Sequence, residues 1–151
     1  MLENSKHIII VGAGIAGLTA ALSLRHYGIR TSIYERSPEI ITAGAGIQLS
    51  PNANRVLSRI GVLKEISSVS IRCHGVKVFD YKSNRQLALF DYMKFKGNDF
   101  FYFCHRADLV GVLYAACQKL EIPVYFNKKL EKIINKKALF SDGETLSAEL
   151  I

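Results

Sequence analysis

The first third of the chain alternates between short apolar runs and a glycine-rich turn. The segment His7–Val11 contains four consecutive β-branched residues. Both of its faces are therefore apolar, as in a strand buried within a parallel sheet. Apolar residues then recur at helical spacing at Ile15, Leu18 and Leu22. Gly28 is suited to end that helix, and residues 30–34 fit a second strand. The pattern predicts a strand, a glycine turn, a helix and a second strand.

The stretch from Ile8 to Leu24 carries no charged side chain, which raises the alternatives of a membrane span or a secretory signal. A spanning helix needs about 20 largely apolar residues, and this stretch is shorter and interrupted by glycines. Glu3 offsets Lys6, so the strongly positive flank of a signal peptide is missing. We therefore expect no transmembrane segment here.

The glycine turn has the spacing of a dinucleotide-binding fingerprint, Gly12-x-Gly14-x-x-Gly17. The first glycine permits the tight turn, the second lets a diphosphate approach the backbone, and the third allows close packing of helix on strand. Exposed N–H groups and the helix dipole then favour an anion without any basic side chain. The residues expected to contact the cofactor here are Gly12, Ala13, Gly14, Ile15, Ala16 and Gly17.

Glu35 follows the second strand, 23 residues after Gly12, near the spacing at which an acidic residue accepts hydrogen bonds from an adenosine ribose. A carboxylate there would repel a 2′-phosphate, which disfavours NADP in this site. FAD and NAD both stay open at this point. The alternative is that the glycines form only a tight turn and that Glu35 is a solvated carboxylate.

Two more helices are predicted further along the chain. Ser50 can cap a helix that has Pro51 in its first turn and ends at Gly61. Its expected apolar face consists of Ala53, Val56, Leu57 and Ile60. The second helix follows an aromatic strand at 99–104, so that Arg106 stands where strand gives way to helix. Its expected apolar face consists of Leu109, Val112, Leu113, Ala116 and Leu120.

After Pro123 the pattern changes to short strands. A first strand is expected at 124–126, and three more are expected at 130–134, 138–140 and 146–151. Turns at Asn135-Lys136 and Asp142-Gly143 separate the last three strands. This predicts a small antiparallel excursion beside the parallel sheet.

Several of these segments together resemble the FAD-dependent aromatic hydroxylases, which include the salicylate and para-hydroxybenzoate hydroxylases. The resemblance is carried by the fingerprint, by Tyr34-Glu35-Arg36, by the segment from Gly44-Ala45-Gly46-Ile47-Gln48 to Gly61, and by Cys104-His105-Arg106-Ala107-Asp108-Leu109. It runs over essentially the entire chain. The fold class it implies is an α/β, Rossmann-like FAD-binding domain with a parallel sheet and a small antiparallel excursion.

The resemblance also implies the chemistry. FAD would be the cofactor, NAD(P)H the co-substrate of the full-length enzyme, and O₂ the source of one oxygen atom transferred to an aromatic or polycyclic small molecule. No side chain of this chain is then expected to be catalytic, because the flavin carries the difficult chemistry. The further cofactor contacts that the resemblance implies are Arg36, Gly46, Ile47, Arg106 and Leu130. An ordinary glycine loop stays the alternative for Gly46, and a surface position stays the alternative for Arg36 and Arg106.

Charge and cysteine content narrow the partners only slightly. Lys and Arg number 20 against 13 acidic residues, a net charge of +7, which favours anionic partners of any kind. The clustered lysines Lys128, Lys129, Lys132, Lys136 and Lys137 alternate with apolar residues, which indicates a solvated sheet face rather than a nucleic-acid site. Cys73, Cys104 and Cys117 lack metal-ligand spacing, so no metal is expected. Their odd number suits the reducing cytoplasm.

The chain ends on the apolar residues Leu150 and Ile151. The expectation is one FAD-binding domain over residues 1–151, incomplete because the substrate domain and a later FAD motif of the family are absent. A complementing C-terminal polypeptide is then a possible partner, and the chain by itself is expected to have little hydroxylase activity. Two alternatives stay open: a catalytically silent fragment with weak nucleotide binding, and a plain NAD-binding domain.

Overall fold

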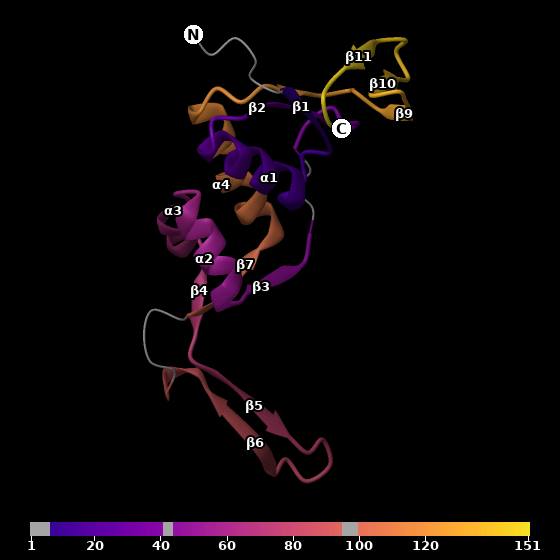
Figure 1. The fold of residues 1–151 in the computed structure, drawn as a ribbon. Helices are drawn as coiled ribbons and strands as arrows, with labels where there is room; N and C mark the ends of the chain where they lie inside the picture. Colours follow the sequence, from indigo (N-terminus) through magenta and orange to yellow (C-terminus); the bar gives the residue numbers. More distant parts are fainter. Residues whose placement is uncertain (1–6, 41–43, 95–99) are drawn as a thin grey trace. The chain divides into compact units, whose positions relative to one another are not determined.

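The computed structural model describes residues 7–40, 44–94 and 100–151 (Figure 1). The chain divides into two compact units. The first is built from residues up to Gly44 and from Arg106 to Ile151, and the second comprises Ala45–His105. The second unit is thus inserted, in sequence, between two halves of the first.

The first unit is organised around a parallel sheet of order β1-β2-β8. Its strands are β1 (His7–Val11), β2 (Arg30–Tyr34) and β8 (Val124–Tyr125). Near the end of the chain, Leu150 forms a parallel bridge with Ile8, and the Leu150 carbonyl accepts a hydrogen bond of 3.0 Å from Ile9 N–H. The two predicted strands are confirmed. Of the β1 residues only Ile9 is fully buried, so the expectation of two buried faces was too strong.

Helix α1 (Ile15–His26) buries Leu18, Ala21 and Leu22. Gly28 has φ +73° and follows the C-cap Tyr27, and Ile29 N–H donates to the Leu24 carbonyl. Together with the hydrogen bond from Gly28 N–H to the Arg25 carbonyl, this forms a Schellman motif, which confirms the predicted end of the helix.

Helix α4 (Arg106–Lys119) buries Leu109, Val110, Leu113 and Cys117. The predicted apolar face is therefore wrong in part. Val112 and Ala116 are only half-buried, and Leu120 lies beyond the helix with 41% of its surface exposed. The buried stripe is rotated because α4 packs against α1, where the Cys117 thiol reaches the Leu18 carbonyl at 3.8 Å.

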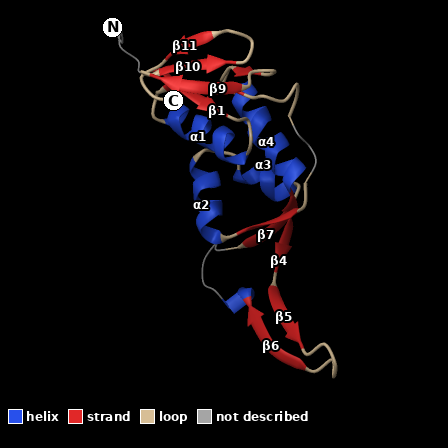
Figure 2. Cartoon of the chain, turned by 90° about the vertical axis from the view of Figure 1, so that its right-hand side faces the viewer, coloured by secondary structure: helices blue, strands red, loops and turns tan. Residues whose placement is uncertain are grey.

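The predicted antiparallel excursion is confirmed as a sheet of order β11-β10-β9 (Figure 1 and Figure 2). Its strands are β9 (Leu130–Ile134), β10 (Lys137–Phe140) and β11 (Thr145–Ser147). Asn135 and Lys136 both have positive φ, as a type I′ hairpin requires. Ala138 and Phe140 form a buried cluster with Ile9 and Tyr34 of the parallel sheet. The last strand is shorter than the predicted 146–151, because the chain leaves β10 and bridges to β1 instead.

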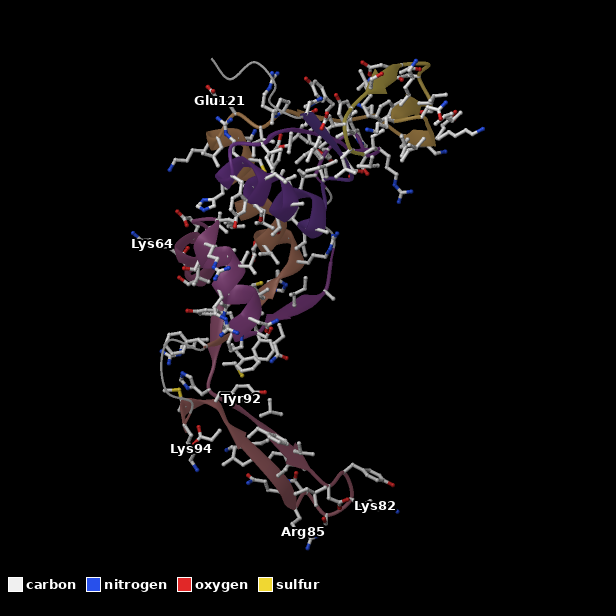
Figure 3. The ribbon with its side chains drawn as sticks, in the orientation of Figure 1. Lys64, Lys82, Arg85, Tyr92, Lys94 and Glu121 are labelled. Atoms are coloured by element: carbon white, nitrogen blue, oxygen red, sulfur yellow. The ribbon has the colours of Figure 1, made fainter. Side chains whose placement is uncertain are left out.

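The second unit contains two small antiparallel sheets. One has the order β3-β7-β4, with β3 (Gly46–Leu49), β7 (Phe101–His105) and β4 (Ile71–Cys73). The other is a hairpin of β5 (Gly75–Phe79) and β6 (Gln86–Asp91), followed by the 3-10 turn η1 (Tyr92–Lys94). Lys82 and Arg85 lie at the tip of this hairpin, and Tyr92 lies at its other end (Figure 3). The Tyr92 ring stacks on Phe101 with a centroid separation of 4.2 Å.

The helices of the second unit are α2 (Pro51–Arg59) and α3 (Leu63–Ser68). Ser50 occupies the N-cap of α2, but its hydroxyl donates to the Asn52 side chain rather than capping the helix. The predicted apolar face is also wrong in part. Val56 is 44% exposed, whereas Asn54 is buried because its side-chain amide donates to the Phe100 carbonyl at 2.6 Å.

The predicted α/β class with parallel and antiparallel sheets is confirmed. Cys104 is buried and its neighbour His105 is exposed, as strand alternation predicts. Among the described residues, no helix is long and apolar enough to cross a membrane.

Candidate functional site

The three glycines of the turn between β1 and α1 occupy three different environments. Gly12 has φ +99°, a conformation that L side chains rarely adopt. A Cβ built on Gly17 would lie 2.0 Å from the Gly12 carbonyl oxygen and 3.2 Å from Ile10 Cγ2, so helix and strand approach too closely for any side chain. A Cβ built on Gly14 would meet nothing within 4 Å. Gly12 and Gly17 thus serve the turn itself, and Gly14 borders open space.

The N-terminus of α1 is free to receive an anion. Gly14 is its N-cap, none of the side chains that the structure describes caps the helix, and its first turn contains no acidic residue. The first intrahelical bond runs from Leu18 N–H to the Gly14 carbonyl, so the N–H groups of the first turn have no acceptor within the helix. These N–H groups and the helix dipole together favour negative charge at this end.

Glu35 is fixed at the carboxyl end of β2 by two backbone hydrogen bonds. Ala13 N–H donates to Oε2 at 2.8 Å and Ser37 N–H donates to Oε1 at 2.9 Å. Partial burial by itself would raise the pKa of Glu35. The two backbone donors and the nearby Arg36 guanidinium outweigh that effect and hold this pKa below its usual value. The group is therefore a carboxylate near neutral pH, oriented beside the glycine turn.

Two hollows meet at Glu35, and its side chain lines both. The first, here called the β2 hollow, has a volume of about 330 Å³ and is lined by residues that include Gly12, Arg36, Lys129 and Leu130. The second, here called the α1 hollow, has a volume of about 60 Å³ and is lined by residues that include Ala13, Gly14 and Arg106. The structure thus brings the glycine turn together with Glu35, Arg36, Arg106 and Leu130.

Arg106 is the first residue of α4, and its side chain lies against Gly44. A Cβ built on Gly44 would lie 2.8 Å from Arg106 Cβ and 3.0 Å from its Cδ. Only a glycine therefore leaves room for this position of the arginine side chain. From the sequence, Gly44 was expected to belong to a loop that brings its backbone close to a ligand. Its contact with Arg106 was not predicted, because nothing local links the two positions.

Gly46 and Ile47 belong to the second unit. Both lie in strand β3, paired with His105 and Cys104 of β7, rather than in the loop that the sequence predicted. Hydrogen bonding to β7 explains the difference, since strand pairing extends to Gly46 itself. A Cβ built on Gly46 would meet nothing within 4 Å.

Sequence reasoning also missed an ion-pair cluster beside the β2 hollow. Lys128 was predicted to belong to a solvated lysine face, but its ammonium contacts the carboxylates of Asp142 and Glu144. The other lysines of that group, Lys129, Lys132, Lys136 and Lys137, are exposed as predicted. The acidic partners lie 14 and 16 residues away in sequence, beyond the reach of a local pattern.

The chain has clear relatives among known proteins. A protein family described as FAD binding domain matches residues 5–144. The 3-amino-4-hydroxybenzoate 2-monooxygenase of Streptomyces cremeus is 36% identical over 156 residues, covering 100% of this chain and 40% of that enzyme. The 3-hydroxybenzoate 6-hydroxylase 1 of Aquipseudomonas alcaligenes is 36% identical over 118 residues, covering 76% of this chain and 30% of that enzyme.

A solved structure shows the same fold. The crystal structure of a mutant 2-methyl-3-hydroxypyridine-5-carboxylic acid oxygenase matches with a TM-score of 0.86 at 24% identity, covering 96% of this chain and 38% of that one. The chain therefore spans 40% or less of the length of each of these three proteins.

Proposed function

Because the chain belongs to the FAD binding domain family, we propose that it binds FAD through the glycine turn and forms the cofactor-binding part of a flavoprotein monooxygenase. The observation that carries the proposal is the combination at one place of the open Gly14 backbone, the uncapped N-terminus of α1 and the oriented Glu35 carboxylate. The first two features suit the diphosphate of an adenine dinucleotide, and the carboxylate suits its ribose.

The residues present fit the cofactor. The diphosphate is placed at the N–H groups of the first turn of α1, which no described side chain caps. The ribose hydroxyls are placed at Glu35, whose carboxylate accepts hydrogen bonds. The adenosine is placed in the β2 hollow beside Arg36 and Leu130. Arg106, at the rim of the α1 hollow, offers guanidinium donors to phosphate or ribityl oxygens.

The cofactor, when bound, supplies the redox chemistry that passes electrons from NAD(P)H to O₂. The residues of this chain bind and orient it, and none of them is assigned a proton transfer. Gly46 and Ile47 are proposed to contact the flavin through their backbone. Gly46, which has open space where a side chain would be, suits such a contact.

The substrate class is proposed from the relatives. The Streptomyces cremeus and Aquipseudomonas alcaligenes enzymes are named for hydroxybenzoates, which are small aromatic acids. We propose a small aromatic substrate for the whole enzyme, with NAD(P)H as co-substrate and without nucleic-acid partners. A complementing polypeptide and a cytoplasmic location are part of the same proposal, and the three buried, free cysteines suit the latter.

Equilibrium dialysis of the purified chain against FAD, NAD and NADP tests the proposal. FAD is expected to bind and to turn the protein yellow, while NADP binds least because of Glu35. Folded protein that takes up no flavin would contradict the proposal and support a silent fragment. Uptake of NAD without FAD would instead indicate a plain NAD-binding domain.

A further inference from the structure

Lys128 stands at the edge of the β2 hollow, but its ammonium is turned to two carboxylates. Nζ contacts Asp142, and it donates to Glu144 Oε2 at 2.5 Å. Asp142 also accepts the backbone N–H of Glu144 through Oδ1 at 3.0 Å, so the two acids form one cluster. These hydrogen bonds raise the pKa of Lys128 to about 12 and lower that of Asp142. The lysine charge is therefore compensated by two carboxylates of the protein.

The backbone around Lys128 is tied to both sides of the site. Lys128 N–H donates to the Glu35 carbonyl at 2.8 Å, and Asn127 N–H donates to the Ser37 carbonyl at 3.0 Å. On the other side, Ser141 N–H donates to the Lys129 carbonyl at 2.9 Å. The segment 127–129 therefore bridges the end of β2, which carries Glu35, and the turn between β10 and β11, which carries the two acids.

The conformation of this bridge is not set by strand pairing. Asn127 has φ +57°, in the left-handed region, which asparagine adopts more readily than most residues. The segment lies between the end of β8 and the start of β9, so sheet pairing within β8 or β9 does not fix it. The side chain of Lys128 and its two acidic partners supply the additional link to the β10–β11 turn.

We propose that Lys128 is a positioning residue for the adenosine end of the cofactor: its ion pairs with Asp142 and Glu144 clamp the β10–β11 turn and hold the Lys129–Leu130 backbone at the wall of the β2 hollow. The inference rests on the proposed function, because it assigns the hollow to the adenosine. Lys128 acts through the backbone and does not contact the ligand.

The test compares variants in two measurements, ADP affinity by calorimetry and amide hydrogen exchange. ADP carries the adenosine and the diphosphate without the flavin. Lys128→Met keeps the aliphatic stem and removes the ammonium, and Lys128→Arg restores both ion pairs. Lys132→Met removes the same charge from an exposed position of β9 and is the matched control. The double variant Asp142→Asn with Glu144→Gln removes the acidic partners and leaves the lysine.

We expect K128M to bind ADP about fivefold more weakly and to show faster amide hydrogen exchange in residues 127–130 and 140–145. K128R and K132M are expected to resemble the unchanged protein in both measurements. The double variant Asp142→Asn with Glu144→Gln discriminates best between the two explanations. A clamp predicts weaker ADP binding, whereas an electrostatic effect of the lysine alone predicts stronger binding, because two negative charges are removed.

Unchanged ADP affinity in K128M, or tighter binding by the double variant, would overturn the proposal. Equal weakening in K128M and K132M would also overturn it, since charge alone would then explain the effect. Failure of the unchanged protein to bind either FAD or ADP would overturn the proposed function, and with it the positioning role. That result is distinguishable because it appears before any substitution is made.

Discussion

The backbone N–H of Ala13, in the middle of the glycine turn, donates a hydrogen bond of 2.8 Å to the carboxylate of Glu35 at the end of the neighbouring strand. The turn and the acidic residue that a dinucleotide needs are therefore joined directly. Ser37 N–H holds the other carboxylate oxygen. Because the carboxylate is already oriented, the Glu35 side chain loses less conformational entropy when a ligand binds.

Glu35→Gln is expected to weaken ADP binding about tenfold, or about 1.4 kcal/mol. The amide keeps the size of the side chain but loses the negative charge, and hydrogen bonds to charged groups are the stronger ones. The preference for ADP over 2′,5′-ADP should narrow at the same time, since the charge that repels a 2′-phosphate is gone. Calorimetric titration with both nucleotides measures this. An unchanged preference would show that Glu35 does not face the ribose.

Because the pKa of Glu35 is lowered in the folded protein, its contribution to the free energy of unfolding is expected to be lost at acid pH. The folded state favours the carboxylate, so its contribution is present above the unfolded value of about 4.5 and is lost as pH falls through the lower folded value. Urea denaturation from pH 3 to 7 should show a constant stability difference between the protein and E35Q above about pH 5. That difference should shrink below pH 4.5. A difference that grows on acidification would mean that the folded pKa is raised instead.

Gly14→Ala and Gly17→Ala should separate binding from folding. At Gly14 the new methyl meets open space and φ is −81°, so the loss of stability is at most about 1 kcal/mol while the methyl obstructs the diphosphate. At Gly17 the methyl collides with the Gly12 carbonyl, and overpacking should cost about 3 kcal/mol. Thermal denaturation and FAD titration of both variants measure the two effects. Equal destabilisation of the two would contradict the different environments of these glycines.

Gly44→Ala should weaken FAD binding severalfold through Arg106. The new Cβ would stand 2.8 Å from Arg106 Cβ, so the arginine side chain must move. Gly111→Ala is the control, because it lies exposed in α4 with nothing within 4 Å and should stabilise the helix by up to about 1 kcal/mol. FAD titration compares the two. Normal FAD binding by G44A would contradict the expectation that Gly44 supports binding through Arg106. Weakened FAD binding by G111A would contradict it as well, because the effect would then not be particular to Gly44.

The parts of the fold that local rules determine were predictable from the sequence. The β-branched run of β1, the glycine that ends α1 and the turn at Asn135-Lys136 depend on residues close together in the chain. The family resemblance was also predicted from the residues and is confirmed by the comparisons. At these positions the prediction agrees with the structure, because the local conformational preference of the residues is the same as the conformation that the fold requires.

The parts that depend on distant neighbours were not predictable in this way. The buried stripe of α4 is set by its packing on α1, and Asn54 is buried because of a carbonyl 46 residues away. The contact of Gly44 with Arg106 likewise joins two positions that are far apart in sequence. The division into two units was not indicated by any linker, since the inserted unit begins and ends without a proline-rich or low-complexity segment.

The central claim is that the backbone at the start of α1 binds the diphosphate of FAD, and a crystal structure of the chain soaked with FAD tests it most directly. The account predicts diphosphate oxygens within hydrogen-bond distance of the N–H groups in residues 14–17, with a ribose hydroxyl at Glu35. Density for FAD elsewhere on the protein, with the glycine turn empty, would contradict it.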